Sequence, residues 1–514
     1  MGFYLLERLQ RHTLPPWVMV AAIATGTFIT ALDQTVVVTA LPAVMADLKI
    51  QIARLEAVIW VVTAYLLGYT VAMPLIGRLA DVYGYTRLYQ CSLLVFCVGT
   101  VLVALSGEWQ WLNGHIDTLD QIVVARVVQA IGGGGTVPIS LAIAAALVSP
   151  EKRGLALGIV AGAAEAGSML GPAYGGAIIE FWSWRGIFWL NVPQAAIIAI
   201  ALLFLPNHRY AEARMDYRGA IVLTLALVML SLAVAHEGLF RFSSWTPYWL
   251  LVGFLVTTGA LVLLQRRTVQ PLLSGTLFRA WAFVMANASQ LLVGISLIVA
   301  MASMVIMANT VMDIPERPVD SFTAALWLLR MTGTIPVFSV IGGLLLRWVD
   351  ARWVTVPGLA FIAIGMFRVS GWQVDIGEPR LTLDMVIAGV GFGLVIAPLM
   401  HRAILSAPLD YRAVSASMIV VARMLGMTLG MAALSAWGVN EFLAIFDDTI
   451  TLPAAQRQEV ISTASLELFQ SFFRAAGIIA ILAIVPASLM RASPIEQAEM
   501  AEAAAQTAGG GGAS

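Results

Sequence analysis

The sequence predicts an all-α integral membrane protein, on the basis of its composition and the length of its apolar runs. Of its 514 residues, 60% are hydrophobic and only 11% are charged, whereas soluble domains carry about 25% charged residues. Such a chain cannot cover a water-facing surface. A net charge of −1 and the lack of basic runs give no sign of nucleic-acid binding.

Fourteen apolar runs are each long enough for a helix to cross about 30 Å of hydrocarbon. None shows the short alternating segments of a membrane barrel. The runs cover residues 17–40, 57–76, 88–106, 121–147, 154–179, 186–205, 219–236, 248–265, 281–309, 322–346, 353–370, 381–400, 413–437 and 474–490.

The distribution of Lys and Arg predicts that both termini lie on the cytoplasmic side. With that orientation, 17 of the 29 basic residues fall in inside segments, nine in outside segments and three within apolar runs. This agrees with the positive-inside rule. Loop 107–120 contains no Lys or Arg and is expected outside. The Ala- and Glu-rich tail 491–514 is expected to be a disordered cytoplasmic segment.

Charged residues within spans are costly and indicate function. Asp33 and Arg126 lie roughly 7 Å and 12 Å outward of the centres of their runs, and we expect them to meet in an outward-facing cavity. Glu165 lies near the centre of its run and has no obvious partner nearby in sequence, so we expect it to be the more desolvated acid. Arg423 lies near the centre of a run in the other half of the chain.

Burial raises the pKa of a carboxylic acid, and a nearby arginine lowers it. A buried acid beside an arginine can therefore take up and release a proton as the arginine moves away and returns. Static ion pairs that fix the packing are the alternative, although a buried ion pair is a poor source of stability.

Small residues surround Glu165 in the stretch IVAGAAEAGSMLGPAYGGAI, residues 159–178. Gly167, Gly171 and Gly175 share one helical face, which allows another helix to approach closely. Pro172, which precedes the Gly175-Gly176 pair, is expected to kink the helix.

A second glycine-rich run, QAIGGGGTVPIS at 129–140, lacks the lysine of a phosphate-binding loop and indicates helix packing. The five histidines have no H-x-x-x-H spacing, and no hydrolase signature occurs, so we expect no metal site and no enzymatic activity.

Five segments resemble signatures of the major facilitator superfamily, in its fourteen-helix drug:proton antiporter branch. They are LDQTVVVTALP (32–42), GRLADVYGYTR (77–87), RVVQAIGGGG (126–135), GSMLGPAYGG (167–176) and WRGIFWLNVP (184–193). The second keeps Gly77, Asp81, Gly84 and Arg87 of a cytoplasmic gating motif, and the fourth matches the antiporter motif in full. The chain departs from the signatures at Val38, where Asn is usual, and at Ala130, where Gly is usual. It also lacks the usual basic residues at positions 82, 85 and 86, which puts the full gating charge network in doubt.

A narrower resemblance is to the mycobacterial lipid exporters of this branch, which move triacylglycerol-type lipids with a lipoprotein partner. It rests on VVARMLGMTLGMAALSAWG (420–438), YLLGYTVAMPLIGRLAD (65–81) and Glu165.

The resemblance implies two six-helix bundles, 1–206 and 281–490, joined by two linker helices in 207–280. It implies a monomer in the bacterial cytoplasmic membrane that exports hydrophobic or amphipathic molecules by alternating access. A proton gradient would drive export without a cofactor. A periplasmic lipoprotein carrier would receive the cargo. Asp33 and Glu165 would respond to protons, Arg126 and Arg423 would be their switching partners, and Asp81 would gate the cytoplasmic side. The glycines around Pro172 would shape a gating helix at the interface between the bundles.

Three alternatives stay open from the sequence. A multidrug:proton antiporter would have no lipid role. A small-solute importer would need a compact polar pocket, for which Asn287 and Gln290 are the main intramembrane polar residues. A membrane scaffold would show no proton-dependent flux.

The outside segment 438–473 is expected to be an extended helical hairpin. An apolar stripe continues through Phe442, Ile445 and Phe446, and a second leads through Leu468 and Phe472 into the last span. Helices over 413–446 and 453–490 would be roughly 50 Å and 57 Å long, well beyond the hydrocarbon core. Helices lying on the membrane surface are the alternative.

Overall fold

A computed structural model describes residues 15–49, 55–108, 117–201, 215–234, 245–312, 321–449 and 454–491, and these residues form helices and connections without strands. The helices of the first half are α2 (Pro16–Asp47), α3 (Leu55–Tyr83), α4 (Tyr85–Ala104), α6 (Thr118–Leu147), α7 (Arg153–Phe181) and α8 (Trp184–Ala201). The middle of the chain forms α9 (Tyr217–Val234), α10 (Thr246–Arg267) and the short α11 (Gly275–Arg279). The second half forms α12 (Trp281–Thr310), α13 (Ser321–Thr332), α14 (Thr334–Leu345), α15 (Ala351–Val369), α16 (Glu378–Leu405), α17 (Arg412–Thr449) and α18 (Ala454–Ser488).

Twelve of the fourteen predicted runs correspond to helices that are long and apolar enough to cross a membrane within the described residues. The predicted count of fourteen spans is therefore not confirmed. Run 186–205 extends beyond α8 into residues that lie outside the described chain. Run 219–236 corresponds to α9 (Tyr217–Val234), which includes the shorter apolar helix Tyr217–Leu230 and beyond which the run continues into residues outside the described chain.

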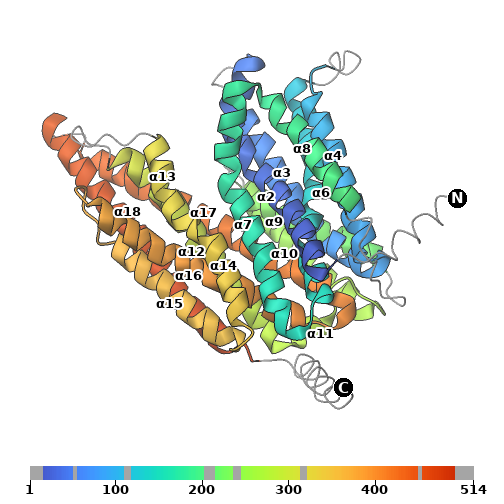
Figure 1. Cartoon of the computed structure of the whole chain (residues 1–514). Coiled ribbons are helices and arrows are strands. Elements are labelled where there is room, and N and C mark those ends of the chain that lie inside the picture. Colours follow the sequence, from blue (N-terminus) through green and yellow to red (C-terminus); the bar gives the residue numbers. More distant parts are fainter. Residues whose placement is uncertain are drawn as a thin grey trace.

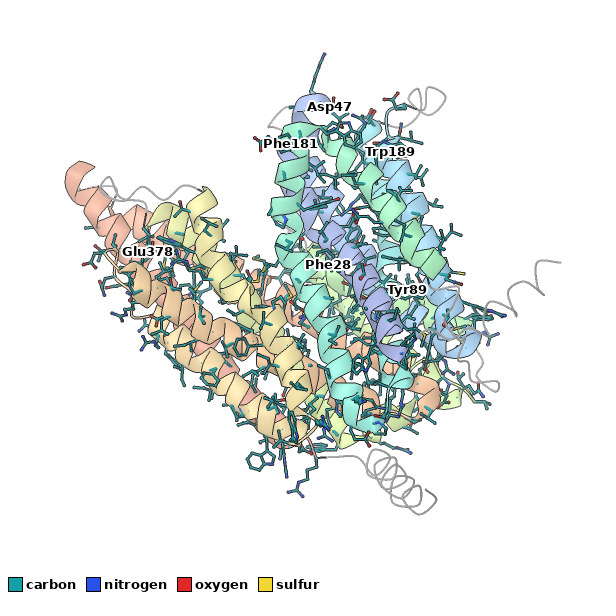
Figure 2. The ribbon with its side chains drawn as sticks, viewed as in Figure 1. Phe28, Asp47, Tyr89, Phe181, Trp189 and Glu378 are labelled. Carbon is teal, nitrogen blue, oxygen red and sulfur yellow. The ribbon has the colours of Figure 1, made fainter. Side chains whose placement is uncertain are left out.

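The two halves of the chain form two groups of helices that meet at one end of the molecule and diverge toward the other (Figure 1). Asp47 and Phe181 mark the divergent end of the first half and Glu378 that of the second (Figure 2). We call this end the open end. The opposite end, near α11, is called the closed end.

The run 322–346, predicted as one helix, is divided into α13 and α14 at Gly333. Pro336 explains the break, because proline has no N–H for the helical ladder and its ring clashes with the carbonyl four residues earlier. By contrast, α7 continues without interruption through Pro172. The break in a predicted helix therefore lies in the second half of the chain, at Gly333.

The linker helices α9 and α10 pack against each other, and α9 also contacts α3 and α17. Helix α10 is almost entirely exposed along its apolar length. Leu255 and Leu263, for example, are each more than 60% exposed. An apolar helix with such a surface is stable only in contact with lipid.

The last two helices are longer than a span requires. Helix α17 has 38 residues and α18 has 35, so they extend about 57 Å and 52 Å at 1.5 Å per residue. They are joined by an edge-to-face contact of Trp437 with Phe472, whose ring centroids are 4.9 Å apart. Residues 450–453 and the tail after Arg491 lie outside the described residues, as does the middle of loop 107–120.

Candidate functional site

Helix α3 seals the closed end by packing its last turns against the start of α17. A Cβ atom on Gly77 would collide with the Ala413 carbonyl oxygen at 2.8 Å, so only glycine allows this approach. The carboxylate of Asp81 accepts hydrogen bonds from the backbone N–H groups of Ala413 and Val414 at 3.2 and 3.3 Å. An acid at the N-terminus of a helix is stabilised by unpaired N–H groups and by the helix dipole.

Arg78 adds a second contact across the closed end that sequence reasoning did not single out. Its Nη1 donates to the Asp410 carbonyl oxygen at 2.8 Å, and its guanidinium lies 4.2 Å from the centre of the Tyr411 ring. Of the other gating-motif residues, Gly84 has a φ of 100° at the turn into α4, and Arg87 is exposed. Asp81, Gly77 and Arg78 thus hold the halves together here.

Helix α7 lies at the interface between the halves, as expected, and has two glycine faces. Gly167 and Gly171 pack against α2 within the same half, where Cβ atoms would strike backbone atoms near Leu32. Gly175 is buried, whereas a Cβ on Gly176 would meet nothing within 4 Å. Gly167 and Gly171 therefore allow the close packing of α7 on α2 inside the first half.

The face of α7 that contacts the other half carries Gly154, Gly158 and Gly162, which the sequence analysis missed. A Cβ on Gly158 would lie 2.8 Å from the Ser339 carbonyl oxygen of α14, and one on Gly162 would lie 2.9 Å from that of Pro336. Their four-residue spacing is the same signal that marked the other face. Spacing alone did not reveal which helix each face meets.

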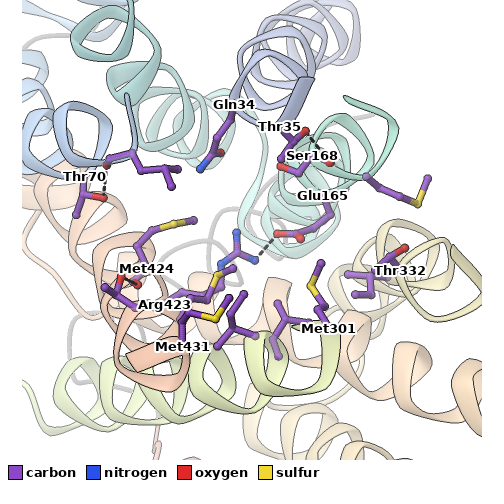
Figure 3. A pocket seen from close by; sticks show the side chains of 17 residues that line it. Gln34, Thr35, Thr70, Glu165, Ser168, Met301, Thr332, Arg423, Met424 and Met431 are labelled. Carbon is purple, nitrogen blue, oxygen red and sulfur yellow. Dashed lines mark hydrogen bonds and ion pairs between the residues drawn. The ribbon is translucent and has the colours of Figure 1, made fainter. Parts of the chain in front are cut away.

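A cavity of about 370 Å³ lies between the two halves (Figure 3). Its apolar wall includes five methionines: Met169, Met301, Met424, Met427 and Met431. Its polar groups are Gln34, the hydroxyls of Thr35, Thr70, Ser168, Thr332 and Thr428, and the charged side chains of Glu165 and Arg423. Methionine side chains are flexible and adapt to irregular apolar ligands.

Glu165 on α7 and Arg423 on α17 form an ion pair inside this cavity (Figure 3). Their side chains are 14% and 9% exposed, so both border the cavity without being fully solvated. Glycines fix the backbone beneath Arg423, because a Cβ on Gly294 of α12 would collide with the Arg423 carbonyl oxygen. The Nε–H of Arg423 makes no hydrogen bond within the described part of the chain.

Asp33 and Arg126 meet as predicted, with 2.8 Å between Oδ2 and Nη1. Both side chains are 0% exposed, and neither residue lines the cavity. The expectation of an outward-facing cavity at this pair is therefore wrong. Because Asp33 is fully buried and Glu165 is not, the expectation that Glu165 is the more desolvated acid is also wrong.

Neutral partners surround the buried pair. Asn191 donates to Asp33 Oδ1 at 2.7 Å, and Arg126 Nη1 also donates to Gln129 Oε1 at 2.6 Å. The Arg126 guanidinium lies 3.9 Å from the centre of the Tyr65 ring. A charge pair with this many partners tolerates burial, and a proton on Asp33 would remove its ionic component.

The third intramembrane arginine, Arg330, pairs with Glu378 at 2.5 Å and Thr382 at 2.7 Å within the second half. Among the described residues no group of three His, Cys, Asp or Glu side chains has an arrangement that would hold a metal ion.

The sequence is similar to curated mycobacterial transporters over most of its length. It is 34% identical to the triacylglyceride transporter of Mycobacteroides abscessus over 434 residues, covering 81% of each chain. It is 34% identical to that of Mycobacterium tuberculosis, covering 83% of each. Identity to that of Mycolicibacterium smegmatis is 32%, over 94% of this chain and 89% of the relative.

Solved transporters share the fold at low sequence identity. A proton:xylose symporter bound to 6-bromo-6-deoxy-D-glucose aligns with a TM-score of 0.61 and 15% identity over 92% of this chain and 94% of its own. The human organic anion transporter MFSD10 aligns with a TM-score of 0.59 and 14% identity over 92% of this chain and 100% of its own. These relatives and neighbours are transporters, not enzymes. The Major Facilitator Superfamily model matches residues 23–431, and the chain therefore belongs to the major facilitator superfamily, as a multi-pass membrane transporter.

Proposed function

We propose that this transporter exports triacylglycerol-type lipids by proton-coupled alternating access. The observation that carries the proposal is the Glu165–Arg423 ion pair, which bridges the two halves inside a methionine-lined cavity. An ion pair between halves that must separate and rejoin is a natural control point for a two-state transporter. The relatives named triacylglyceride transporters support the lipid cargo.

The open end is proposed to face the outside and the closed end the cytoplasm of a bacterial inner membrane. The basic residues at the closed end support this orientation, since helices carry basic residues in their first or last two turns there: Arg78, Arg153, Arg352, Arg402 and Arg412. Positively charged segments are retained on the cytoplasmic side. The described state is then outward-facing, with the cytoplasmic gate closed by Gly77, Arg78 and Asp81.

The cavity suits a cargo with flexible chains and a few polar groups. Methionine thioethers adapt to acyl chains, whereas the Ser168 hydroxyl and the Gln34 amide of the wall can donate to ester carbonyls. A polar small solute would find few fixed partners in this wall. This chemistry disfavours the small-solute importer.

Protons are proposed to act at both acids. A proton on Glu165 would release Arg423, weakening the contact between the halves and freeing guanidinium donors for cargo. A proton on Asp33 would release Arg126 inside the first half. No cofactor takes part, and the chain would work as a monomer that passes lipid to a periplasmic lipoprotein carrier near the α17–α18 extension.

The test is reconstitution in liposomes that contain labelled triacylglycerol, with and without an imposed pH gradient. Proton-driven lipid efflux that stops with a protonophore is the expected result. A second assay uses small amphipathic dyes in the same vesicles. Dye efflux without lipid efflux would favour a multidrug:proton antiporter, and the absence of any gradient-dependent flux would favour a scaffold.

A further inference from the structure

Two tyrosines of α3 lie between the two ion pairs. The Tyr65 ring lies against the Arg126 guanidinium at 3.9 Å, and Tyr69 precedes Thr70, whose side chain lines the cavity that holds Arg423 and Glu165. The two rings stack on each other, with centroids 5.8 Å apart and an interplanar angle of 21°. Both residues are buried, at 0% and 2% exposure. They form a continuous aromatic contact that begins at the Arg126 guanidinium and ends next to Thr70 in the cavity wall.

The glycine run of α6 makes the space for these rings. A Cβ on Gly133 would lie 2.9 Å from Tyr65 Oη and 3.6 Å from a ring carbon of Tyr69. A Cβ on Gly134 would lie 2.5 Å from the Tyr69 carbonyl oxygen. The sequence alone indicates helix packing at these glycines. The structure shows that they leave space for the side chains of Tyr65 and Tyr69. The two tyrosines are therefore closely packed against α6.

We propose that Tyr65 and Tyr69 are positioning residues that couple the protonation state of Asp33 to the Glu165–Arg423 pair. This rests on the proposed function, in which both acids take up protons. When Asp33 is neutral, Arg126 keeps Gln129 and the face of Tyr65 as its remaining partners. A cation on an aromatic ring is held by the ring quadrupole. Movement of the guanidinium therefore moves Tyr65, and close packing passes this displacement to Tyr69.

The proposed coupling must link the side chains around Asp33 with those around Glu165. Asp33 is faced by Arg126 and Gln129 from α6, Asn191 from α8 and Tyr65 from α3, with Tyr174 of α7 in electrostatic range. Glu165 is faced by Arg423 from α17, with Tyr69 in electrostatic range. Helices α3 and α7 both contribute residues to the two sets, and the contact between the Tyr65 and Tyr69 rings gives α3 a packed route between them.

A double-mutant cycle tests the coupling without measuring transport. Spin labels at Ala177 on α7 and Ala325 on α13, both exposed, report the separation of the open ends after Cys91 and Cys97 are replaced by serine. The ratio of separated to closed populations is measured for the parent, Asp33→Asn, Glu165→Gln and the double variant. The cycle is repeated with Tyr65→Leu, Tyr65→Phe, Tyr69→Leu and Phe96→Leu.

In the parent background we expect the two acid substitutions to be non-additive by at least about fivefold in the population ratio, the lower end of typical site-to-site coupling. With Tyr65→Leu or Tyr69→Leu the two effects should become additive within about twofold. Tyr65→Phe should keep the coupling, since the ring carries it and Tyr65 Oη makes no hydrogen bond within the described chain. The proposal remains testable if either Tyr65→Leu or Tyr69→Leu fails to fold, because the other variant interrupts the same contact.

Phe96→Leu is the matched control, because Phe96 is a buried aromatic that packs on the same glycine run from α4. Equal loss of coupling in Phe96→Leu, undiminished coupling in the tyrosine variants, or additivity in the parent would each overturn the inference. Loss of coupling in Tyr65→Phe would overturn a role for the ring. Failure of lipid efflux in liposomes would instead count against the proposed function, because the cycle needs no cargo.

Discussion

Glu165 on α7 and Arg423 on α17 form an ion pair across the cavity between the two halves, although 258 positions separate them in the sequence. The pair is a direct charged contact at the cavity, whereas the close glycine contacts of Gly77, Gly154 and Gly158 with the other half lie toward the closed end. Formation or loss of this ion pair therefore affects how firmly the two halves are held together at the cavity.

Glu165→Gln should lower proton-driven lipid efflux by at least about tenfold, equivalent to about 1.4 kcal/mol of lost coupling. The glutamine keeps the size of the side chain but cannot take up a proton. Efflux is measured in liposomes across pH 5.5 to 8, with Arg423→Lys as a companion that keeps the charge. Unchanged transport and pH dependence in Glu165→Gln would assign the pair a structural role.

Asp33→Asn should abolish proton-driven efflux and lower the melting temperature, because Arg126 would remain buried without an ionic partner. The double variant Asp33→Asn/Arg126→Gln should recover stability without recovering transport. Thermal unfolding in detergent and efflux in liposomes separate the two effects. Wild-type efflux in Asp33→Asn would remove Asp33 from the proton path.

Gly158→Val should open the closed end, because its side chain would enter the backbone of α14 near Ser339. A cysteine at Ser339, which is 0% exposed, should then react with a membrane-impermeant maleimide. Gly176→Ala on the same helix is the control, since a Cβ there meets nothing within 4 Å. We expect it to transport normally despite its place in the antiporter motif. Loss of transport in Gly176→Ala would contradict this reading of the motif.

Removing two helical turns each from the distal ends of α17 and α18 should reduce lipid efflux more than dye efflux, because the extension is proposed to shelter lipid outside the bilayer. Spin-label accessibility at Phe446 and Leu468 gives an independent measurement. Labels well outside the bilayer are expected. Labels at headgroup depth would show that the helices lie on the membrane surface.

Asp47 should stabilise the contact between α2 and α8 only above acidic pH. The Trp184 indole N–H and the Arg185 guanidinium hold the pKa of Asp47 below its usual value. Its contribution is thus present above the unfolded pKa of about 3.9 and is lost as the pH falls through the lower folded pKa. Asp47→Asn should lower the melting temperature at pH 7 and lower it less at about pH 3, which lies below the unfolded pKa. An equal shift at both pH values would exclude the charge as its cause.

The sequence by itself determined that the chain is a helical membrane protein, where most of its spans lie and which charged residues they contain. Hydropathy and helix length are local properties, so a run such as 281–309 is recognisable without its neighbours. Motif residues were found for the same reason, since Gly77 and Asp81 lie within one short segment of the chain.

The tertiary structure decided which residues meet. The depth of Asp33 and Arg126 predicted their contact, but their complete burial depends on Gln129 of α6 and on Asn191 and Tyr65 from two other helices. Two glycine faces with the same spacing on α7 turned out to contact different partners, α2 and α14. The Glu165–Arg423 pair arises because helix packing brings together distant parts of the chain, and the energy of such contacts depends on distance in space, not on separation in sequence.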